Sequence, residues 1–396
     1  MLDPIIQLRR ALHRRPELSG SETGTAREIA RFFKPLKPDL LLEGLGGNGL
    51  AAVFSGKEVG PTVLLRCELD ALPIQEDIEI DYQSTKDRVS HKCGHDGHMA
   101  ILAAVGTELA AHRPVRGRVV LLYQPAEENG EGAAAVVKDP KFSEIKPHFA
   151  FASHNLPGFP LGQVVIRAGV FNCASRGMTV SLSGRTAHAA QPETGRSPAA
   201  TMCHFINQLS ALPPEIVAGN ETAFATIVGA RLGGKAFGTA PGNAKIWVTL
   251  RSETDITMSR LVRFAEQVAN KSAREHGLMV DINFEDVFDA TINSESAVDL
   301  VQRSIGTNSV IVPEKPFRWS EDFGRITAVS EGALFGIGAG TDIPDLHNPD
   351  YDFPEELIPV TTRLLLRVVD NALASEIAVK PFYCTRFTQS PRILNP

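Results

Sequence analysis

The chain has 396 residues, of which 43% are hydrophobic and 22% are charged, which is typical of a globular protein long enough for two hydrophobic cores. Its 46 acidic and 40 basic residues give a formal net charge of -6 and are spread along the sequence. No block of like charge is present to follow a phosphate backbone or an anionic membrane, and no apolar run is long enough to span a bilayer. We therefore expect no nucleic-acid or membrane partner.

The N-terminal residues predict an amphipathic helix rather than a secretion signal. Ile5, Leu8 and Leu12 are interspersed with arginines, without the apolar region and small-residue cleavage site of a signal peptide. We therefore expect a cytoplasmic protein. The five cysteines are widely separated and odd in number, which argues against a disulfide framework. A cysteine close to His and Glu is then a candidate metal ligand.

Strands and helices alternate over the first part of the chain. After the first helix, residues 19–22 (Ser-Gly-Ser-Glu) have the spacing of a capping box for a second helix that runs to residue 33. A helical pattern covers 99–111, and short apolar runs predict four strands, at 49–54, 62–67, 118–123 and 149–153. This alternation predicts an α/β sheet with parallel pairs.

The pattern changes near residue 174. Six predicted elements follow in the order β-α-β-β-α-β, at 178–182, 198–209, 223–229, 244–252, 258–276 and 279–284. That order is typical of a ferredoxin-like domain. Because the α/β pattern then resumes with a strand at 333–338 and a helix at 359–374, we expect residues 174–290 to be inserted into a catalytic domain made of residues 1–173 and 291–396. Its sheet should be mixed, largely parallel and flanked by helices, and the proline-containing C-terminal end predicts an irregular tail.

Three histidines, a cysteine and an aspartate crowd into residues 91–98, His-Lys-Cys-Gly-His-Asp-Gly-His. Cys93 and His95 flank a glycine, so both side chains can turn toward one point. A lone histidine in this position would be an ordinary polar residue before a helix. The density of ligands instead favours a metal site, where a neighbouring ion would keep the thiol deprotonated.

Two adjacent carboxylates, Glu127 and Glu128, follow the strand predicted at 118–123. Alone they would indicate a solvated acidic turn. Beside the Cys-His cluster, a turn allows one carboxylate to bind metal while the other faces the substrate. We predict that Glu128 is a ligand and that Glu127 is the general base, which deprotonates the attacking water and then protonates the leaving nitrogen.

Two isolated histidines complete the predicted ligand set. His154 ends an apolar run, and His347 lies in a Gly- and Pro-rich loop after the strand at 333–338. Most of the candidate ligands follow strands, where open α/β sheets place their ligand crevice. A mixture of sulfur, nitrogen and oxygen donors favours zinc, manganese or another transition metal over calcium or magnesium.

Three further residues each allow two interpretations. Asp70, like Glu68, could fix a histidine tautomer or hold a strand-end turn, and Asp322 could line the site or cap a helix. His188 follows a strand of the inserted domain without ligand neighbours. It is either a structural histidine or a donor to the tetrahedral oxyanion, if this domain or that of a partner subunit folds over the crevice.

In this order, the residues resemble the aminoacylase-like amidohydrolases of the zinc-peptidase superfamily. That group includes hippurate hydrolases, N-acetyl-amino-acid and N-acetyldiaminopimelate deacetylases, and plant auxin-conjugate hydrolases. The matches extend over nearly the whole chain and are His91-x-Cys93-Gly94-His95-Asp96-x-His98, Gln124-Pro125-Ala126-Glu127-Glu128, Gly184-x-x-Ala187-His188-Ala189-Ala190, Glu321-Asp322-Phe323 and His347-Asn348-Pro349 with Asp352-Phe353.

The resemblance implies a catalytic domain with two divalent metal ions, zinc or manganese first, with cobalt or nickel as alternatives. It implies Glu127 as general acid/base and an inserted domain that forms a homodimer, with His188 stabilising the transition state across it. The implied ligands are Cys93, which would bridge the ions, and His95, Glu128, His154 and His347.

The chain departs from the resembled pattern in three places. Gly238 stands where an asparagine is common, so a polar side chain expected near the substrate is missing, and the substrate preference could differ. Lys92 stands where alanine is usual and places a positive charge beside the cluster, and Glu68 replaces a commoner aspartate. The expected ligands themselves are intact.

We therefore expect hydrolysis of the amide bond of a small N-acyl amino acid, with acetyl as the first candidate acyl group. A dipeptidase is the alternative within the superfamily, and it would need a pocket for a free α-amino group. A noncatalytic metal- or ligand-binding protein is the alternative of another class. Loss of Glu127 or of a ligand would favour that alternative, and neither is lost.

Overall fold

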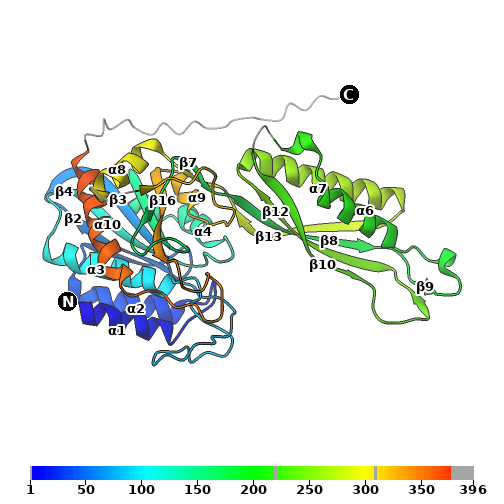
Figure 1. Ribbon diagram of the computed structural model, residues 1–396, viewed down its shortest axis with the longest axis horizontal. Coiled ribbons are helices and arrows are strands. Elements are labelled where there is room, and N and C mark those ends of the chain that lie inside the picture. Colours follow the sequence, from blue (N-terminus) through cyan, green and yellow to red (C-terminus); the bar gives the residue numbers. More distant parts are fainter. Residues whose placement is uncertain (1, 218–220, 307–309, 376–396) are drawn as a thin grey trace.

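The computed structural model describes residues 2–217, 221–306 and 310–375, which form two units, each built on its own main sheet (Figure 1). The larger unit has an eight-stranded sheet and the smaller one a four-stranded sheet. Helices pack on both. The tail expected at the C-terminal end falls on residues 376–396, outside the described residues.

The eight-stranded sheet is mixed, and its central strands are parallel. β3 (Glu58–Glu68) pairs in parallel with β4 (Arg116–Gln124) and β5 (Phe149–Pro157), and β5 pairs in parallel with β16 (Glu331–Gly340). The outer strands are β1 (Leu40–Leu45), β2 (Gly49–Ser55), β6 (Val164–Val165) and β15 (Val310–Ile311). The predicted mixed, largely parallel sheet is confirmed, and the carboxyl ends of four adjacent strands meet at one edge.

Alternate residues of the central strands pack into different cores, because successive side chains of a strand point to opposite faces. Leu65 and Leu121 join the core under α1 (Leu2–His13), α2 (Thr23–Phe33), α3 (His95–Ala111), α8 (Glu295–Ile305) and α10 (Leu357–Ala374). Leu64 and Leu122 join the core under α4 (Gly132–Lys138), α5 (Phe142–Ile145) and α9 (Gly324–Thr327). Helices therefore cover both faces of this sheet.

The smaller unit has the predicted β-α-β-β-α-β order. Its elements are β8 (Ala174–Ser183), α6 (Ala199–Ser210), β10 (Ala223–Leu232), β12 (Asn243–Ser252), α7 (Asp255–Glu275) and β13 (Met279–Phe288). All neighbours in its sheet, β10-β12-β8-β13, are antiparallel. The inward side chains of β8 and β12 form a core with α6 and α7 whose buried residues all lie within 174–290, with Val170 packed against it from outside. We propose domain boundaries at these two positions.

The capping box predicted for the second helix is wrong. Helix α2 begins at Thr23 without a side-chain cap. Ser19 Oγ instead donates to Asp70, and the buried Glu22 carboxylate accepts from the backbone N–H groups of Gly20 (2.7 Å) and Ala126 (2.8 Å). Ala126 has a positive φ of 50°, so Glu22 stabilises the turn that presents Glu127.

A second difference concerns the start of the long helix α3, which begins at His95 rather than near residue 99. Gly94 precedes it with φ of 89°, and a Cβ at that position would lie 2.7 Å from Asn155 Oδ1. Glycine is therefore required between Cys93 and His95. Across the described part of the chain, no helix is long and apolar enough to cross a bilayer.

A fragment of residues 174–290 should fold without the rest of the chain, since its core is its own. We expect one cooperative thermal transition by circular dichroism, and loss of that transition in Val248→Asp, which buries a charge in the core. A fragment without a cooperative transition would show that the proposed boundaries are wrong.

Candidate metal centre

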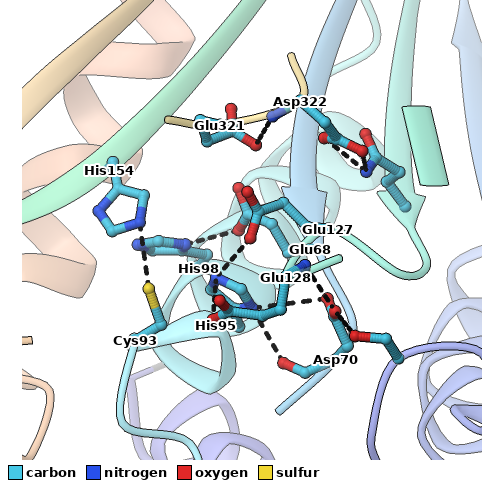
Figure 2. Close-up of polar contacts among 12 residues, drawn as sticks. Glu68, Asp70, Cys93, His95, His98, Glu127, Glu128, His154, Glu321 and Asp322 are labelled. Carbon is cyan, nitrogen blue, oxygen red and sulfur yellow. Dashed lines mark hydrogen bonds and ion pairs between the residues drawn. The ribbon is translucent and has the colours of Figure 1, made fainter. Parts of the chain in front are cut away.

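The five predicted ligands converge on the carboxyl edge of the eight-stranded sheet, where open α/β sheets bind ligands. Glu128 follows β4, His154 lies near the end of β5, and His347 lies in the loop after β16. Cys93 and His95 come from the start of α3. Figure 2 shows the side chains of Cys93, His95, Glu128 and His154 around one space.

The ligand atoms form two groups that share Cys93. In the first, one ligand atom each of Cys93, His95 and His154 lies within 4.8 Å of the others, and Cys93 Sγ is 3.5 Å from His154 Nε2. In the second, Cys93, Glu128 and His347 meet the same limit, and His347 Nε2 is 3.9 Å from Glu128 Oε2. This arrangement suits a pair of ions with Cys93 between them.

Two ligand atoms show that the residues fit metal. His95 Nε2 and Glu128 Oε1 are buried, 3.8 Å apart, and have no hydrogen-bond partner among the described residues. Buried polar atoms without a partner are rare in folded proteins. Thiol, imidazole and carboxylate donors are the set that a borderline transition metal prefers.

The neighbours of the two buried histidines fix which ring nitrogen faces the cluster. His95 Nδ1 donates to the backbone oxygen of Asp70 (2.9 Å), and His154 Nδ1 donates to the backbone oxygen of Asn155 (2.8 Å). Each leaves Nε2 as the free ligand atom. The Asp70 carboxylate also accepts from the Glu128 N–H (3.0 Å), so Asp70 contacts two of the predicted ligands.

His98, the last histidine of the motif, has both ring nitrogens engaged. Nδ1 lies 2.6 Å from Glu68 Oε2, and Nε2 contacts Asn155 Oδ1. The His98 ring packs edge-on against the His154 ring, with 4.9 Å between their centroids. Glu68 thus contacts a histidine, as one of its two interpretations allows, whereas the contacts of His98 with Asn155 and with the ring of the predicted ligand His154 were not predicted from the sequence.

A buried arginine organises the carboxylates on the other side of the cluster. Arg66 Nη2 lies 2.7 Å from both Glu321 Oε1 and Asp322 Oδ1, and Arg66 also contacts Glu68. Asp322 accepts from the Ala133 N–H (2.7 Å) in the first turn of α4 and does not line the cavity described below. Both interpretations of Asp322 stay open, because its carboxylate accepts from the first turn of α4 and also lies within 4.8 Å of carboxylate oxygens of Glu127 and Glu321.

Glu127 is buried beside its ligand neighbours, with Oε2 3.8 Å from His95 Nε2 (Figure 2). Burial, and next the nearby Glu321 and Glu128, raise the pKa of Glu127 well above its usual value. A carboxyl group with a raised pKa can both accept and return a proton near neutral pH.

A cavity of about 270 Å³ opens onto the cluster. Trp319, Phe288 and Leu346 give it an apolar wall, and its other lining residues are Cys93, Glu127, Glu128, His154, Ser320, Glu321 and His347. The Trp319 ring lies 5.7 Å from the His154 ring, centroid to centroid. Trp319 and Glu321 were missed as cavity residues, although Glu321 belongs to a recognised motif and Trp319 is one of only two tryptophans in the sequence.

Two predicted site residues, His188 and Gly238, lie away from the cluster of the same chain. His188 lies in β9 (Ala187–His188), which pairs with β11 (Thr239–Ala240) at the outer end of the smaller unit (Figure 1). His188 is exposed. Gly238 lies beside it, with its backbone oxygen accepting from the Ala189 N–H (2.9 Å).

Lys92 does not reach the cavity. Its side chain is fully buried, with Nζ 2.6 Å from Glu76 Oε1 and 2.8 Å from the backbone oxygen of Tyr351. The charge that distinguishes this chain beside the cluster is therefore neutralised behind the ligands and does not contact a substrate in the cavity.

The sequence between residues 64 and 371 matches the family model described as peptidase family M20/M25/M40. The chain belongs to this family. Among curated relatives, it is 29% identical to an N-acetyldiaminopimelate deacetylase of Oenococcus oeni, over 88% of this chain and 94% of the relative. It is 28% identical to a hippurate hydrolase of Campylobacter jejuni, over 89% and 92% of the two chains.

The fold also matches solved structures. One is the Bacillus subtilis YXEP protein, described as a dinuclear metal-binding peptidase of family M20. The TM-score is 0.78 at 22% identity, with 94% of this chain and 98% of that chain covered. Because the match covers 94% of this chain, its two units share the fold of that protein.

Proposed function

We propose that this chain is a metal-dependent amidohydrolase that cleaves the amide bond of small N-acyl amino acids. The observation that carries this proposal is the position of Glu127, a buried carboxyl group at the wall of a small cavity and beside two ligand groups that share Cys93. The names of the deacetylase and hippurate hydrolase relatives support this substrate class.

In this proposal, two divalent ions, zinc or manganese first and cobalt or nickel as alternatives, bind to Cys93, His95, Glu128, His154 and His347. When bound, they would polarise the scissile carbonyl and lower the pKa of a water molecule. The free Nε2 of His95 and the free Oε1 of Glu128 support this ligand set. Asp70 would hold both residues in place through its backbone and side-chain oxygens.

Glu127 would move the proton in this reaction. Its carboxylate would take a proton from the attacking water and pass it to the nitrogen of the leaving amine. The negative charge of Glu321, which Arg66 holds in place (2.7 Å), raises the pKa of Glu127 and so favours the protonated form that the second step needs. The apolar wall at Trp319 and Phe288 would contact the acyl group.

The charge pattern of the cavity disfavours the dipeptidase alternative. A free α-ammonium group would need an unpaired carboxylate to receive it. Glu128 is a proposed ligand, and Glu321 is already engaged, by Arg66 and the Asp322 N–H at Oε1 and by the Phe323 N–H at Oε2. The noncatalytic alternative does not account for a buried carboxyl group, Glu127, at the wall of the cavity.

We further propose a homodimer formed through the smaller unit, with His188 of the partner subunit as donor to the oxyanion. Two observations support this: His188 is exposed at the outer end of its unit, and the only imidazoles among the described residues that line the cavity of its own chain, His154 and His347, are proposed ligands. Gly238, next to His188, would then lie near the substrate and leave space there.

A substrate panel tests the proposed class. Protein loaded separately with zinc, manganese, cobalt or nickel should hydrolyse N-acetyl or N-benzoyl amino acids with kcat/KM roughly 10-fold or more above that for matched dipeptides, because the cavity offers no partner for an ammonium group. Auxin-conjugated amino acids complete the panel. Equal or faster cleavage of dipeptides would establish the peptidase alternative.

Glu127→Gln tests the proposed mechanism. The substitution keeps the shape of the side chain but removes its basicity, so kcat should fall by about 10²–10⁴-fold while metal content stays at the wild-type level. His154→Ala is the matched control and should lower metal content, measured by elemental analysis. Unchanged turnover in Glu127→Gln would sink the assigned role.

Mixing two inactive variants tests the dimer. Homodimers of His188→Ala and of Glu127→Gln should both be nearly inactive, but a hybrid contains one cavity with an intact Glu127 and the intact His188 of the partner subunit. Equal co-expression should therefore restore about one quarter of wild-type activity, because about half of the dimers are hybrids with one working site of two. No recovery, despite hybrids seen by native mass spectrometry, would contradict the shared site.

A further inference from the structure

A fully buried lysine links the two loops that carry the outer ligands. Lys92 directly precedes Cys93, and its backbone oxygen accepts from the N–H of His347 (2.8 Å). Its Nζ donates to the backbone oxygen of Tyr351 (2.8 Å), four residues further along the same loop. One residue thus holds the loop of His347 at two points.

The loop at 341–356 depends on such contacts because it contains no helix or strand. His347 has a positive φ of 67°, a conformation that a non-glycine residue keeps only when its surroundings impose it. The His347 side chain is 51% exposed, so burial alone does not orient it. Hydrogen bonds to the loop backbone, at His347 and at Tyr351, must therefore position the ring.

Glu76 orients Lys92 from the opposite side. Glu76 Oε1 accepts from Lys92 Nζ (2.6 Å) and contacts His13 Nε2 (2.8 Å), while Oε2 accepts from the Ser84 N–H (2.6 Å). His13 Nδ1 in turn contacts Asp96 Oδ2 (2.9 Å), in the first turn of α3. Buried ion pairs stabilise folding little, because desolvation offsets their attraction, but they fix geometry.

The two ligand groups differ in their dependence on Lys92. His95 and His154 are oriented by the backbone oxygens of Asp70 and Asn155, which lie at strand ends and do not contact Lys92. The His347 ring makes no hydrogen bond among the described residues, its Nε2 lies 3.9 Å from Glu128 Oε2, and its backbone N–H is held by Lys92. A change at Lys92 should therefore affect one group more than the other.

We propose that Lys92 and Glu76 are positioning residues for the Cys93–Glu128–His347 group, and that they set the affinity of this group for its metal ion without contacting the substrate. The inference rests on the proposed two-ion site. It also accounts for a lysine where alanine is usual in the resembled family: here the ion pair braces a loop that carries a ligand.

Lys92→Met tests the proposal, because it keeps the length of the side chain but removes its donors to Glu76 and Tyr351. Zinc is titrated into metal-free protein against a competing chelator, and bound ions are counted by native mass spectrometry. Loss of a residue that orients a ligand typically lowers metal affinity by about 10–100-fold, so we expect that loss for one ion and a change within about twofold for the other. Equal weakening of both ions, or of neither, would overturn the proposal.

Two further variants separate positioning from folding. Lys92→Met/Glu76→Gln removes both charges, so its thermal stability should recover relative to Lys92→Met, whereas the weakened affinity for one ion should remain because the bond to Tyr351 is still missing. Recovery of both properties would assign the pair a purely structural role and overturn the proposal. Lys141→Met is the matched control, since Lys141 Nζ also donates to backbone oxygens, of Glu43 (2.8 Å) and Gly44 (3.2 Å), but away from the cluster.

The same experiment distinguishes this proposal from the proposed function. Wild-type protein that binds two zinc ions, with equal affinities in Lys92→Met, would reject the positioning role alone. Wild-type protein that binds no zinc would reject the metal centre itself.

Discussion

Several acidic groups are buried together after β3 and β4 and before α9, and the rest of the larger unit depends on how their charge is balanced. Glu127 and Glu128 both have raised pKa values, which burial causes first. Arg66 pairs with Glu321 and Asp322 on one side, and Asp70 accepts from Ser19 and Glu128 on the other. The buried atoms His95 Nε2 and Glu128 Oε1 have no hydrogen-bond partner among the described residues, and the space between them and Cys93 suits cations.

The supports around this space are not equivalent. The His154 ring is held by the backbone oxygen of Asn155 within β5, and the His95 ring by the backbone oxygen of Asp70, two residues beyond the end of β3. His347 rests on an irregular loop that is tied down by the Lys92 backbone and side chain. One group of predicted ligands thus has its histidines held at or beside the sheet, and the other has His347 held through a buried ion pair; this difference is the physical basis of the proposed unequal affinities for two ions.

His188 of the smaller unit lies far from the cavity of the larger unit. The smaller unit folds around its own core and carries His188 at its outer end, away from the cavity of the same chain (Figure 1). At that position, His188 can act as a donor to a substrate only if the cavity of a second copy of the chain lies next to it. The exposed Phe237 (91%) and the side-chain-free Gly238 lie on the same surface, so the chemistry of this surface would shape the substrate preference.

Local patterns in the sequence determined the order of strands and helices, the ferredoxin-like arrangement, and the identity of the residues that gather at the cluster. These follow from periodicity and from ligand density, which are properties of short segments. They did not predict α8, although its apolar residues recur at helical spacing, nor the partners of Glu22, which formed no capping box. Tertiary structure alone decided that Lys92 points away from the cavity, that Asp322 accepts from the first turn of α4 and that Arg66 pairs with Glu321. Each of these depends on residues more than a hundred positions apart, or on which side of a loop faces the core, and no local pattern specifies such contacts.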